Sequence, residues 1–237
     1  MIGRLRDAIR RGRLRGAAWV RLLDGARALA SSEGRSRLWT RLAHRQALHQ
    51  VSGYTEEDRY PGLFDLAART RPDAARILSF GCSTGAELAA LRRRFPEAAI
   101  VGAEIDARSR ALARRRMAGD AATSVVPPER IEGRFDLIFA LAVLQVQPHR
   151  VAEAGIEDLS EIYPFARFDA QLAELAARLR PGGLLCLYNA HYRVEDSSVA
   201  TGLEAIAGSP ALEHPIFAPD GRRLPPGTVG RSLFRRR

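Results

Sequence analysis

A cluster of small and polar residues follows an apolar run in the first half of the chain. The run Ile77–Phe80 meets Gly81-Cys82-Ser83-Thr84-Gly85, and a helical pattern begins directly afterwards. A glycine turn after a strand lets a bound molecule touch the backbone, because no side chain stands in the way. The unsatisfied N–H groups of the helix that starts there face the same molecule. Residues 81–85 are therefore the first candidate for a ligand-binding site.

Two classes of ligand use a glycine loop between a strand and a helix: dinucleotides and S-adenosylmethionine (SAM). A dinucleotide needs the spacing G-x-G-x-x-G to seat its pyrophosphate. This loop reads G-x-x-x-G, with Ser83 in the place of the middle glycine, which disfavours a dinucleotide. Glu104 ends the second apolar run, where a carboxylate accepts hydrogen bonds from both ribose hydroxyls of an adenosine. Glu104 supports a nucleoside ligand without separating the two classes.

Four stretches of the chain resemble a known protein family. "ILSFGCSTGAEL", "IVGAEID", "FDLIFALAVL" and "LRPGGLLCLYNAHY" are similar to motifs I, II and IV and to the strand-five region of class I SAM-dependent methyltransferases, in the order and at the distances of that family. The resemblance covers roughly residues 54–237. It implies a methyltransferase with SAM as its cofactor. The cofactor contacts that it implies lie at Gly81, Cys82, Ser83, Thr84, Gly85, Glu104, Ile105, Asp106, Ala140 and Leu141.

The loop is similar, within this family, to that of the chemotaxis-receptor (CheR-type) methyltransferases, which methylate glutamate side chains. In that group acidic residues after the loop help to hold the methionine portion of the cofactor. Glu87 occupies one such position, and it matters because Ser79 stands where many methyltransferases carry an acid. A threonine and an arginine ahead of the loop also reach the cofactor site in that group. Thr55 and Arg59 match them in spacing, although Arg59 could instead pair on the surface.

Other positions depart from the related patterns. The cysteine-arginine-asparagine run of CheR-type enzymes is replaced by Ala140-Leu141-Ala142, which argues against receptor methylation. The Asn/Asp-Pro-Pro-aromatic motif of amino-directed DNA methyltransferases is absent from the sequence. Glu129, just past Pro128, is the best candidate for the third-strand acid that often touches adenine.

The residues that would face a methyl acceptor follow the fourth and fifth apolar strands. Methyl transfer from a sulfonium is an in-line displacement, so the protein mostly supplies alignment, and a base is needed only if the acceptor must lose a proton early. His191 is a possible general base, with a loop histidine of ordinary pKa as the alternative. Tyr192 and Asn189 could orient the acceptor or simply close the strand end. We expect Cys82, in a tight turn with no base nearby in sequence, to pack rather than react.

The elements that must position these residues alternate between strands and helices. Strands separated by helices of about ten residues indicate βαβ units and a parallel sheet, whose ligands bind beyond the carboxyl ends of the strands. The family resemblance makes this a Rossmann-like, seven-stranded, mostly parallel sheet with helices on both faces and one reversed strand, which a C-terminal hairpin at "PDGRR" could supply. Strands are predicted at 77–80, 100–103, 123–126, 135–144 and 184–190, and helices at 86–94, 108–117 and 168–179.

The N-terminal part differs from the rest in charge. Residues 1–50 carry twelve arginines and three acidic residues, and thus nine of the ten excess positive charges of the chain. Helical spacing of apolar residues continues through this part. We predict a basic helical extension over 1–52 and a methyltransferase domain over 53–237. The extension is either a solvated appendage or a lid or contact for an acidic or membrane surface.

Composition narrows the classes of partner and compartment. All 37 basic residues are arginines, which codon bias explains, so the charge of +10 is weak support for an anionic partner. No metal-ligand spacing involves the two cysteines. Two free thiols, the lack of an apolar run of about 18 residues and the lack of a signal peptide predict a cytoplasmic protein. The acceptor is expected to be a small molecule, lipid or glycan. The alternatives are a CheR-like protein methyltransferase, an RNA methyltransferase and a non-catalytic SAM-binding protein.

Overall fold

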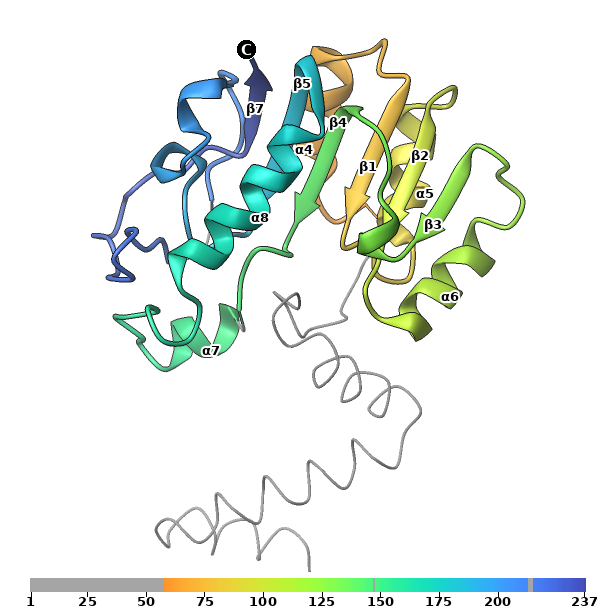
Figure 1. The fold of residues 1–237 in the computed structure, drawn as a ribbon. Coiled ribbons are helices and arrows are strands. Elements are labelled where there is room, and N and C mark those ends of the chain that lie inside the picture. Colours follow the sequence, from red (N-terminus) through yellow and green to blue (C-terminus); the bar gives the residue numbers. More distant parts are fainter. Residues whose placement is uncertain (1–57, 147, 213–214) are drawn as a thin grey trace, which may run out of the picture. The chain divides into compact units, whose positions relative to one another are not determined.

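Seven strands form one sheet in the described part of the chain, as the computed structural model shows (Figure 1). The structure describes residues 58–146, 148–212 and 215–237. The order across the sheet is β3-β2-β1-β4-β5-β7-β6, and β7 runs antiparallel to both of its neighbours. The expected α/β sheet with one reversed strand is therefore confirmed. The strands are β1 Arg76–Phe80, β2 Ala99–Ala103, β3 Thr123–Val126, β4 Phe135–Leu141, β5 Leu179–Tyr188, β6 Leu203–Ala205 and β7 Leu233–Arg236.

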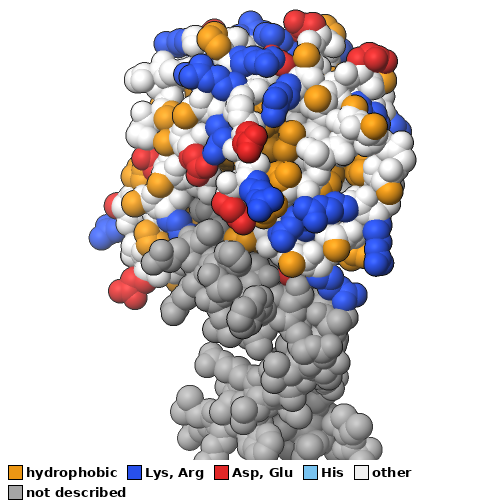
Figure 2. All heavy atoms as spheres, turned by 45° about the vertical axis from the view of Figure 1, so that its right-hand side comes forward, with side chains coloured by type: hydrophobic (Ala, Val, Ile, Leu, Met, Phe, Trp, Pro, Cys, Tyr) orange, Lys and Arg blue, Asp and Glu red, His pale blue; other side chains and the backbone are white. Residues whose placement is uncertain are grey.

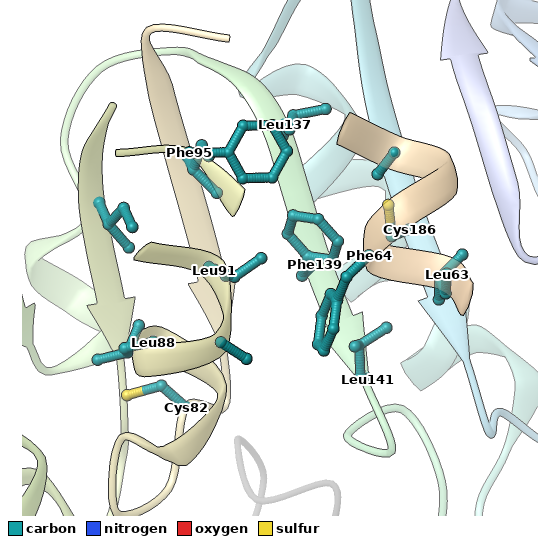
Figure 3. Packing of buried hydrophobic residues seen from close by; sticks show 14 of the residues in the cluster. Leu63, Phe64, Cys82, Leu88, Leu91, Phe95, Leu137, Phe139, Leu141 and Cys186 are labelled. Carbon is teal, nitrogen blue, oxygen red and sulfur yellow. The ribbon is translucent and has the colours of Figure 1, made fainter. Parts of the chain in front are cut away.

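Helices cover both faces of this sheet and create two apolar clusters. One cluster joins the sheet to α4, α5 and α6, and the other joins it to α7 and α8 (Figures 1 and 3). Alternate residues of β4 belong to different clusters: Phe139 faces the first and Ile138 the second. All seven residues of β4 are buried, as a central parallel strand requires. The helices are α4 Pro61–Thr70, α5 Ala86–Arg94, α6 Ala107–Arg116, α7 Pro148–Glu153 and α8 Phe165–Ala177.

The carboxyl ends of the central strands lie level with one another. Phe80 of β1 pairs with Ala103 of β2, and Leu141 of β4 pairs with Tyr188 of β5. The loops after these strands therefore meet at one edge of the sheet. This edge is the place where open parallel sheets bind their ligands.

Four local predictions differ from the structure. The fifth strand, expected at 184–190, spans Leu179–Tyr188 and therefore begins and ends earlier. The fourth strand ends at Leu141 rather than at residue 144, because Ala142 takes a left-handed backbone with φ 55°. The sequence "PDGRR" forms a turn closed by an isolated bridge between Phe217 and Arg223, whereas the reversed strand is β7. The helix expected at 168–179 begins earlier, at Phe165, directly after Pro164.

A buried carboxylate holds together the opposite, amino-terminal edge of the sheet. Asp136 of β4 is 3% exposed, and its Oδ2 accepts from the backbone N–H groups of Ala75 and Arg76 at 3.1 and 2.9 Å. Arg180 Nη1 donates to both carboxylate oxygens, at 3.1 and 3.0 Å, and Arg71 Nη2 lies 3.7 Å from Oδ1. The start of β1, the start of β4 and the start of β5 are thus joined through one side chain.

The described residues belong to one compact unit. The predicted helical extension over 1–52 and its boundary lie outside the described residues, so both stay predictions. No helix in the described part of the chain has the length and apolar content of a membrane-crossing segment. Arginine side chains are interspersed with acidic and apolar ones on the face shown in Figure 2. Charge on that face is therefore mixed rather than of one sign.

Candidate functional site

The loop after β1 folds back tightly on the end of β2. The N–H groups of Gly81 and Cys82 both donate to the carbonyl of Ala103, at 2.8 and 3.1 Å, and Gly85 N donates to the Cys82 carbonyl at 2.9 Å. Gly81, Ser83 and Gly85 all have positive φ, at 81°, 49° and 84°. These bonds and dihedrals hold the predicted loop as one rigid turn that ends at the first residue of α5.

Glycine is required at both ends of this turn. A Cβ on Gly81 would come within 2.4 Å of Val143 Cγ2, because the segment after β4 packs directly on the loop. A Cβ on Gly85 would lie 3.1 Å from both Cα and Cβ of Ala113 in α6. The two glycines thus allow the loop to touch the segment after β4 on one side and α6 on the other.

Replacing Gly85 by valine is expected to weaken binding of the ligand of this loop at least tenfold. A β-branched residue at φ 84° is strained, and the added Cβ forces either α6 or the loop to move. Isothermal titration calorimetry with S-adenosylhomocysteine (SAH) measures the loss. Gly119→Val is the matched control, because a Cβ at Gly119 meets nothing within 4 Å. Equal affinities for the two variants would contradict the prediction.

Glu104 connects the loop to the start of α6. Its Oε2 accepts from Ser83 N at 2.8 Å, and its Oε1 accepts from Asp106 N at 2.7 Å. Asp106 in turn caps α6, with Oδ1 accepting from Ser109 N at 2.8 Å. Burial raises the pKa of the Glu104 carboxyl, while the two amide hydrogen bonds act in the opposite direction. Each oxygen keeps a further lone pair that can accept from a ligand hydroxyl.

Glu87 lies behind the loop, on the first turn of α5. Ser79 Oγ, buried in β1, donates to Glu87 Oε1 at 2.7 Å. Ser79 thus connects β1 to the first turn of α5 through the Glu87 carboxylate. Burial raises the pKa of Glu87 to about 7, against the lowering effect of the Ser79 bond. Burial also raises the pKa of the Cys82 thiol, and the charges of Glu104 and Glu87 add to this effect, which favours the expected packing role for this buried residue.

The raised pKa of Glu87 predicts a pH-dependent stability. A folded-state pKa of about 7 exceeds the ordinary value of 4.5, so the contribution of this group to the free energy of unfolding is present at low pH and is lost as pH rises toward 7. We expect Glu87→Gln to become more stable than the wild type by on the order of 1–3 kcal/mol between pH 5 and pH 8. Urea unfolding at both pH values measures the difference. Parallel pH profiles of the two proteins would contradict it.

The ends of β4 and β5 are joined by a backbone bond and carry unusual dihedrals. Ala142 N donates to the Tyr188 carbonyl at 2.8 Å. Ala142 and Asn189 have φ values of 55° and 52°, so non-glycine residues in the left-handed region follow β4 and β5, as Ser83 does after β1. Such strain costs of order 1–3 kcal/mol and clusters at functional sites. The three strained residues point to the carboxyl edge as the functional edge of the sheet.

Asn189 makes a contact that the sequence did not reveal. Its Nδ2 donates to the Tyr60 hydroxyl at 2.7 Å, across 129 residues of chain. Tyr60 directly precedes Pro61 at the start of α4, so its place beside β5 depends on the tertiary fold. A tyrosine next to Arg59 in the predicted cofactor segment was the one available signal.

His191 and Tyr192 lie in the interior, where neither side chain is exposed. His191 Nε2 is 2.9 Å from the Val146 carbonyl, and burial lowers the pKa of the imidazole, so the alternative of an ordinary loop histidine is wrong. The Tyr192 hydroxyl donates to the Tyr163 carbonyl at 2.6 Å, and burial raises its pKa to about 12. Burial of both side chains argues against direct contact with an acceptor, and their catalytic roles remain untested predictions.

The remaining predicted residues are dispersed. Glu129 lies exposed in the short helix η1, Pro128–Arg130. Ala140 and Leu141 are buried within β4. Arg59 is exposed, with its guanidinium 5.2 Å from the centre of the Tyr60 ring, and Thr55 lies outside the described residues. The residues that the structure brings together are those of the loop 81–85, Glu87, Glu104, Ile105 and Asp106.

Both cysteines lie in the interior of the described part of the chain. Cys82 and Cys186 are both free and buried. Within residues that the structure describes, no three His, Cys, Asp or Glu side chains form a group that could hold a metal ion. The expected lack of a metal stays a prediction.

Curated relatives match part of the chain. A trans-aconitate 2-methyltransferase of Methylobacterium nodulans is 36% identical over 125 residues, which are 52% of this chain and 42% of that protein. A second one, of Deinococcus radiodurans, is 28% identical over 113 residues, 48% of this chain and 37% of that protein. The matched region therefore spans about two fifths of each relative. No protein-family model matches the chain.

Two solved structures are similar to part of the chain. SAM-bound CalS10, an amino pentose methyltransferase from Micromonospora echinaspora, is 28% identical, with a TM-score of 0.42 over 65% of this chain and 56% of that one. TrmN from Thermus thermophilus is 16% identical, with a TM-score of 0.47 over 84% and 53%. In sequence, about half of the chain is similar to curated methyltransferases.

Proposed function

We propose that the chain is a SAM-dependent methyltransferase that acts on a small-molecule acceptor. One observation carries this proposal: Glu104, at the end of β2, accepts from the N–H of Ser83 in the glycine loop after β1. The carboxylate that would bind the ribose and the backbone of the glycine loop are thereby held together at the carboxyl edge of the sheet. The similarity to two curated methyltransferases supports the same conclusion.

The residues of the loop fit this cofactor. The Ser83 hydroxyl is buried and has no partner in the structure, so it can bond the amino-acid end of a ligand without breaking another contact. Gly81 and Gly85 let the loop pack against Val143 and Ala113, which fixes the position of its backbone. Glu104 has lone pairs left for the ribose hydroxyls after accepting two amide bonds.

The reaction mainly requires that the chain align the methyl group of the cofactor with the acceptor. When bound, SAM supplies a methyl group that is already activated by the positive charge of its sulfonium. The rigid turn at residues 81–85 and the carboxylate of Glu104 hold the two ends of the cofactor and thus direct the methyl group. The segment after β4, where Val143 packs on Gly81, borders the loop on one side.

The names of the curated relatives suggest which acceptor to test first. Both curated relatives bear the name trans-aconitate 2-methyltransferase. Trans-aconitate is therefore the first acceptor to assay. Lipid, glycan, protein glutamate and RNA acceptors are the other classes that the assay has to separate from it.

Ligand binding and methyl transfer test the proposal in two steps. We expect calorimetry to detect binding of SAH but not of NAD, and SAH to raise the Tm by several degrees at saturation. Transfer of label from methyl-labelled SAM to trans-aconitate then tests the acceptor. Heat with NAD and none with SAH would overturn the proposal. Binding of SAH without transfer to any acceptor class would make the chain a non-catalytic SAM-binding protein.

A further inference from the structure

The segment that follows β4 is held at both of its ends by β5 and the residues after β5. Residues 142–146 lead from β4 toward α7 (Figure 1). The first of them, Ala142, donates its N–H to the carbonyl of Tyr188, at 2.8 Å. The carbonyl of the last, Val146, lies 2.9 Å from Nε2 of His191. Because a carbonyl can only accept, Nε2 carries a proton and donates it to this bond.

The imidazole of His191 is itself fixed in its orientation. The residue has no exposed surface, and its backbone carbonyl accepts from the N–H of Phe217 at 2.8 Å. The two rings also pack edge-on, with centroids 5.7 Å apart. Phe217 belongs to the fully buried residues as well. His191 is therefore a rigid support for the Val146 carbonyl.

The turn 142–146 is closed by its own side chain and reaches the glycine loop. Gln145, which is 2% exposed, donates its backbone N–H to the Val143 carbonyl at 2.9 Å and its Nε2 to the Ala142 carbonyl at 3.2 Å. The side chain of Leu144 is buried in the apolar cluster on the α8 side. Val143 occupies the space that a side chain at Gly81 would need. A continuous set of contacts thus connects β5, through the turn, to the first glycine of the loop.

We propose that His191 is a positioning residue for the loop 81–85, because its hydrogen bond to Val146 holds the turn 142–146 in the place where Val143 packs on Gly81. The imidazole acts through the turn and not as a general base. Without this bond the Val146 carbonyl lacks its donor, and the turn can move to find another. Val143 then leaves Gly81, and the loop loses a packing partner. This inference rests on the proposed function, in which the loop binds SAM.

Calorimetry with SAH on two variants of His191 tests the hydrogen bond. His191→Phe keeps a planar ring but cannot donate, so we expect it to weaken SAH binding about fivefold. His191→Gln offers an amide N–H in the place of Nε2 and should restore the affinity to within about twofold of the wild type. Wild-type affinity in His191→Phe, or an equal loss in both variants, would overturn the proposal.

A double-mutant cycle tests whether the effect passes through the turn. Val143→Ala removes the contact with Gly81, leaves the buried imidazole in place and should weaken SAH binding about threefold. The double variant with His191→Phe should lose about fivefold, no more than His191→Phe alone, because both changes break the same path. A loss of about fifteenfold would show independent effects and overturn the proposal. Wild-type affinity in Val143→Ala would do so even if His191→Phe failed to fold.

Ser232→Ala is the matched control for loss of a buried hydrogen bond. Ser232 has no exposed surface, and its hydroxyl donates to the Pro210 carbonyl at 2.6 Å. The substitution should lower the Tm and leave the affinity for SAH unchanged. A loss of affinity equal to that of His191→Phe would assign both effects to general destabilisation and overturn the positioning role. Failure of the folded wild-type protein to bind SAH would instead overturn the proposed function.

Discussion

Replacing Glu104 by alanine is expected to abolish measurable SAH binding and to lower the Tm by several degrees. The substitution leaves the N–H groups of Ser83 and Asp106 without their carboxylate acceptor. Hydrogen bonds to a charged group contribute about 1.5–3 kcal/mol each. The loop after β1 and the N-terminus of α6 lose their common anchor, and SAH loses the acceptor that we propose for its ribose. Differential scanning fluorimetry with and without SAH measures both effects.

A surface carboxylate provides the comparison for Glu104. Glu97 is exposed between α5 and β2, and Glu97→Ala should change neither the Tm nor the shift caused by SAH. Glu104→Gln is a sharper variant, because its amide keeps one acceptor oxygen but turns an N–H group toward a backbone donor. We expect it to lose most of the affinity as well. An SAH-induced shift of wild-type size in Glu104→Ala would refute the role of this residue.

Asp136→Ala is expected to cause the largest loss of stability, about 3–5 kcal/mol, because it leaves the charge of Arg180 and two backbone N–H groups without their buried partner. For a chain of this size the loss corresponds to a fall in Tm of roughly 10 °C. The affinity of the folded protein for SAH should not change, since Asp136 lies at the opposite edge of the sheet. Urea unfolding and calorimetry on the same samples separate the two quantities.

Asp73 is the matched control for Asp136, because both carboxylates lie near Arg71 but only Asp73 is exposed to solvent. Asp73 pairs with Arg71 at 3.1 Å, but its side chain is 72% exposed. Exposed ion pairs contribute about 0–1 kcal/mol, so Asp73→Ala should cost little. Similar losses for the two variants would show that charge alone, and not burial, determines the effect.

The succession of strands and helices along the chain and the glycine loop were predictable from the sequence, because both depend on local patterns. Ile77–Phe80 and the glycines that follow it carry their own strand, turn and helix signals, and Glu104 follows a second such strand. The structure places Ser83 and Glu104 in contact, as the carboxyl ends of neighbouring parallel strands require. Pairing of β5 with β7 was predictable only from the family resemblance, since a reversed strand has no signature in periodicity.

The acceptor side was not predictable, because its geometry depends on contacts between distant residues. Polar residues follow the fifth strand in the sequence, which suggested that His191 and Tyr192 carry exposed catalytic groups. The Tyr192 hydroxyl instead donates to the Tyr163 carbonyl, and His191 Nε2 lies within hydrogen-bond distance of the Val146 carbonyl. Both carbonyls belong to the segment between β4 and α8. The pairing of Asn189 with Tyr60 spans 129 residues and follows from where α4 packs.

The place of β7 between β5 and β6 has a consequence for the assembly of the sheet. Strand β6 pairs with β7, which comes almost thirty residues later, and β7 in turn pairs with β5. During folding, β6 therefore has no hydrogen-bonded neighbour in the sheet until β7 has docked. Until then the long edge of β5 offers unpaired N–H and C=O groups to any other chain. Substitutions that delay the docking of β7 should for this reason promote aggregation.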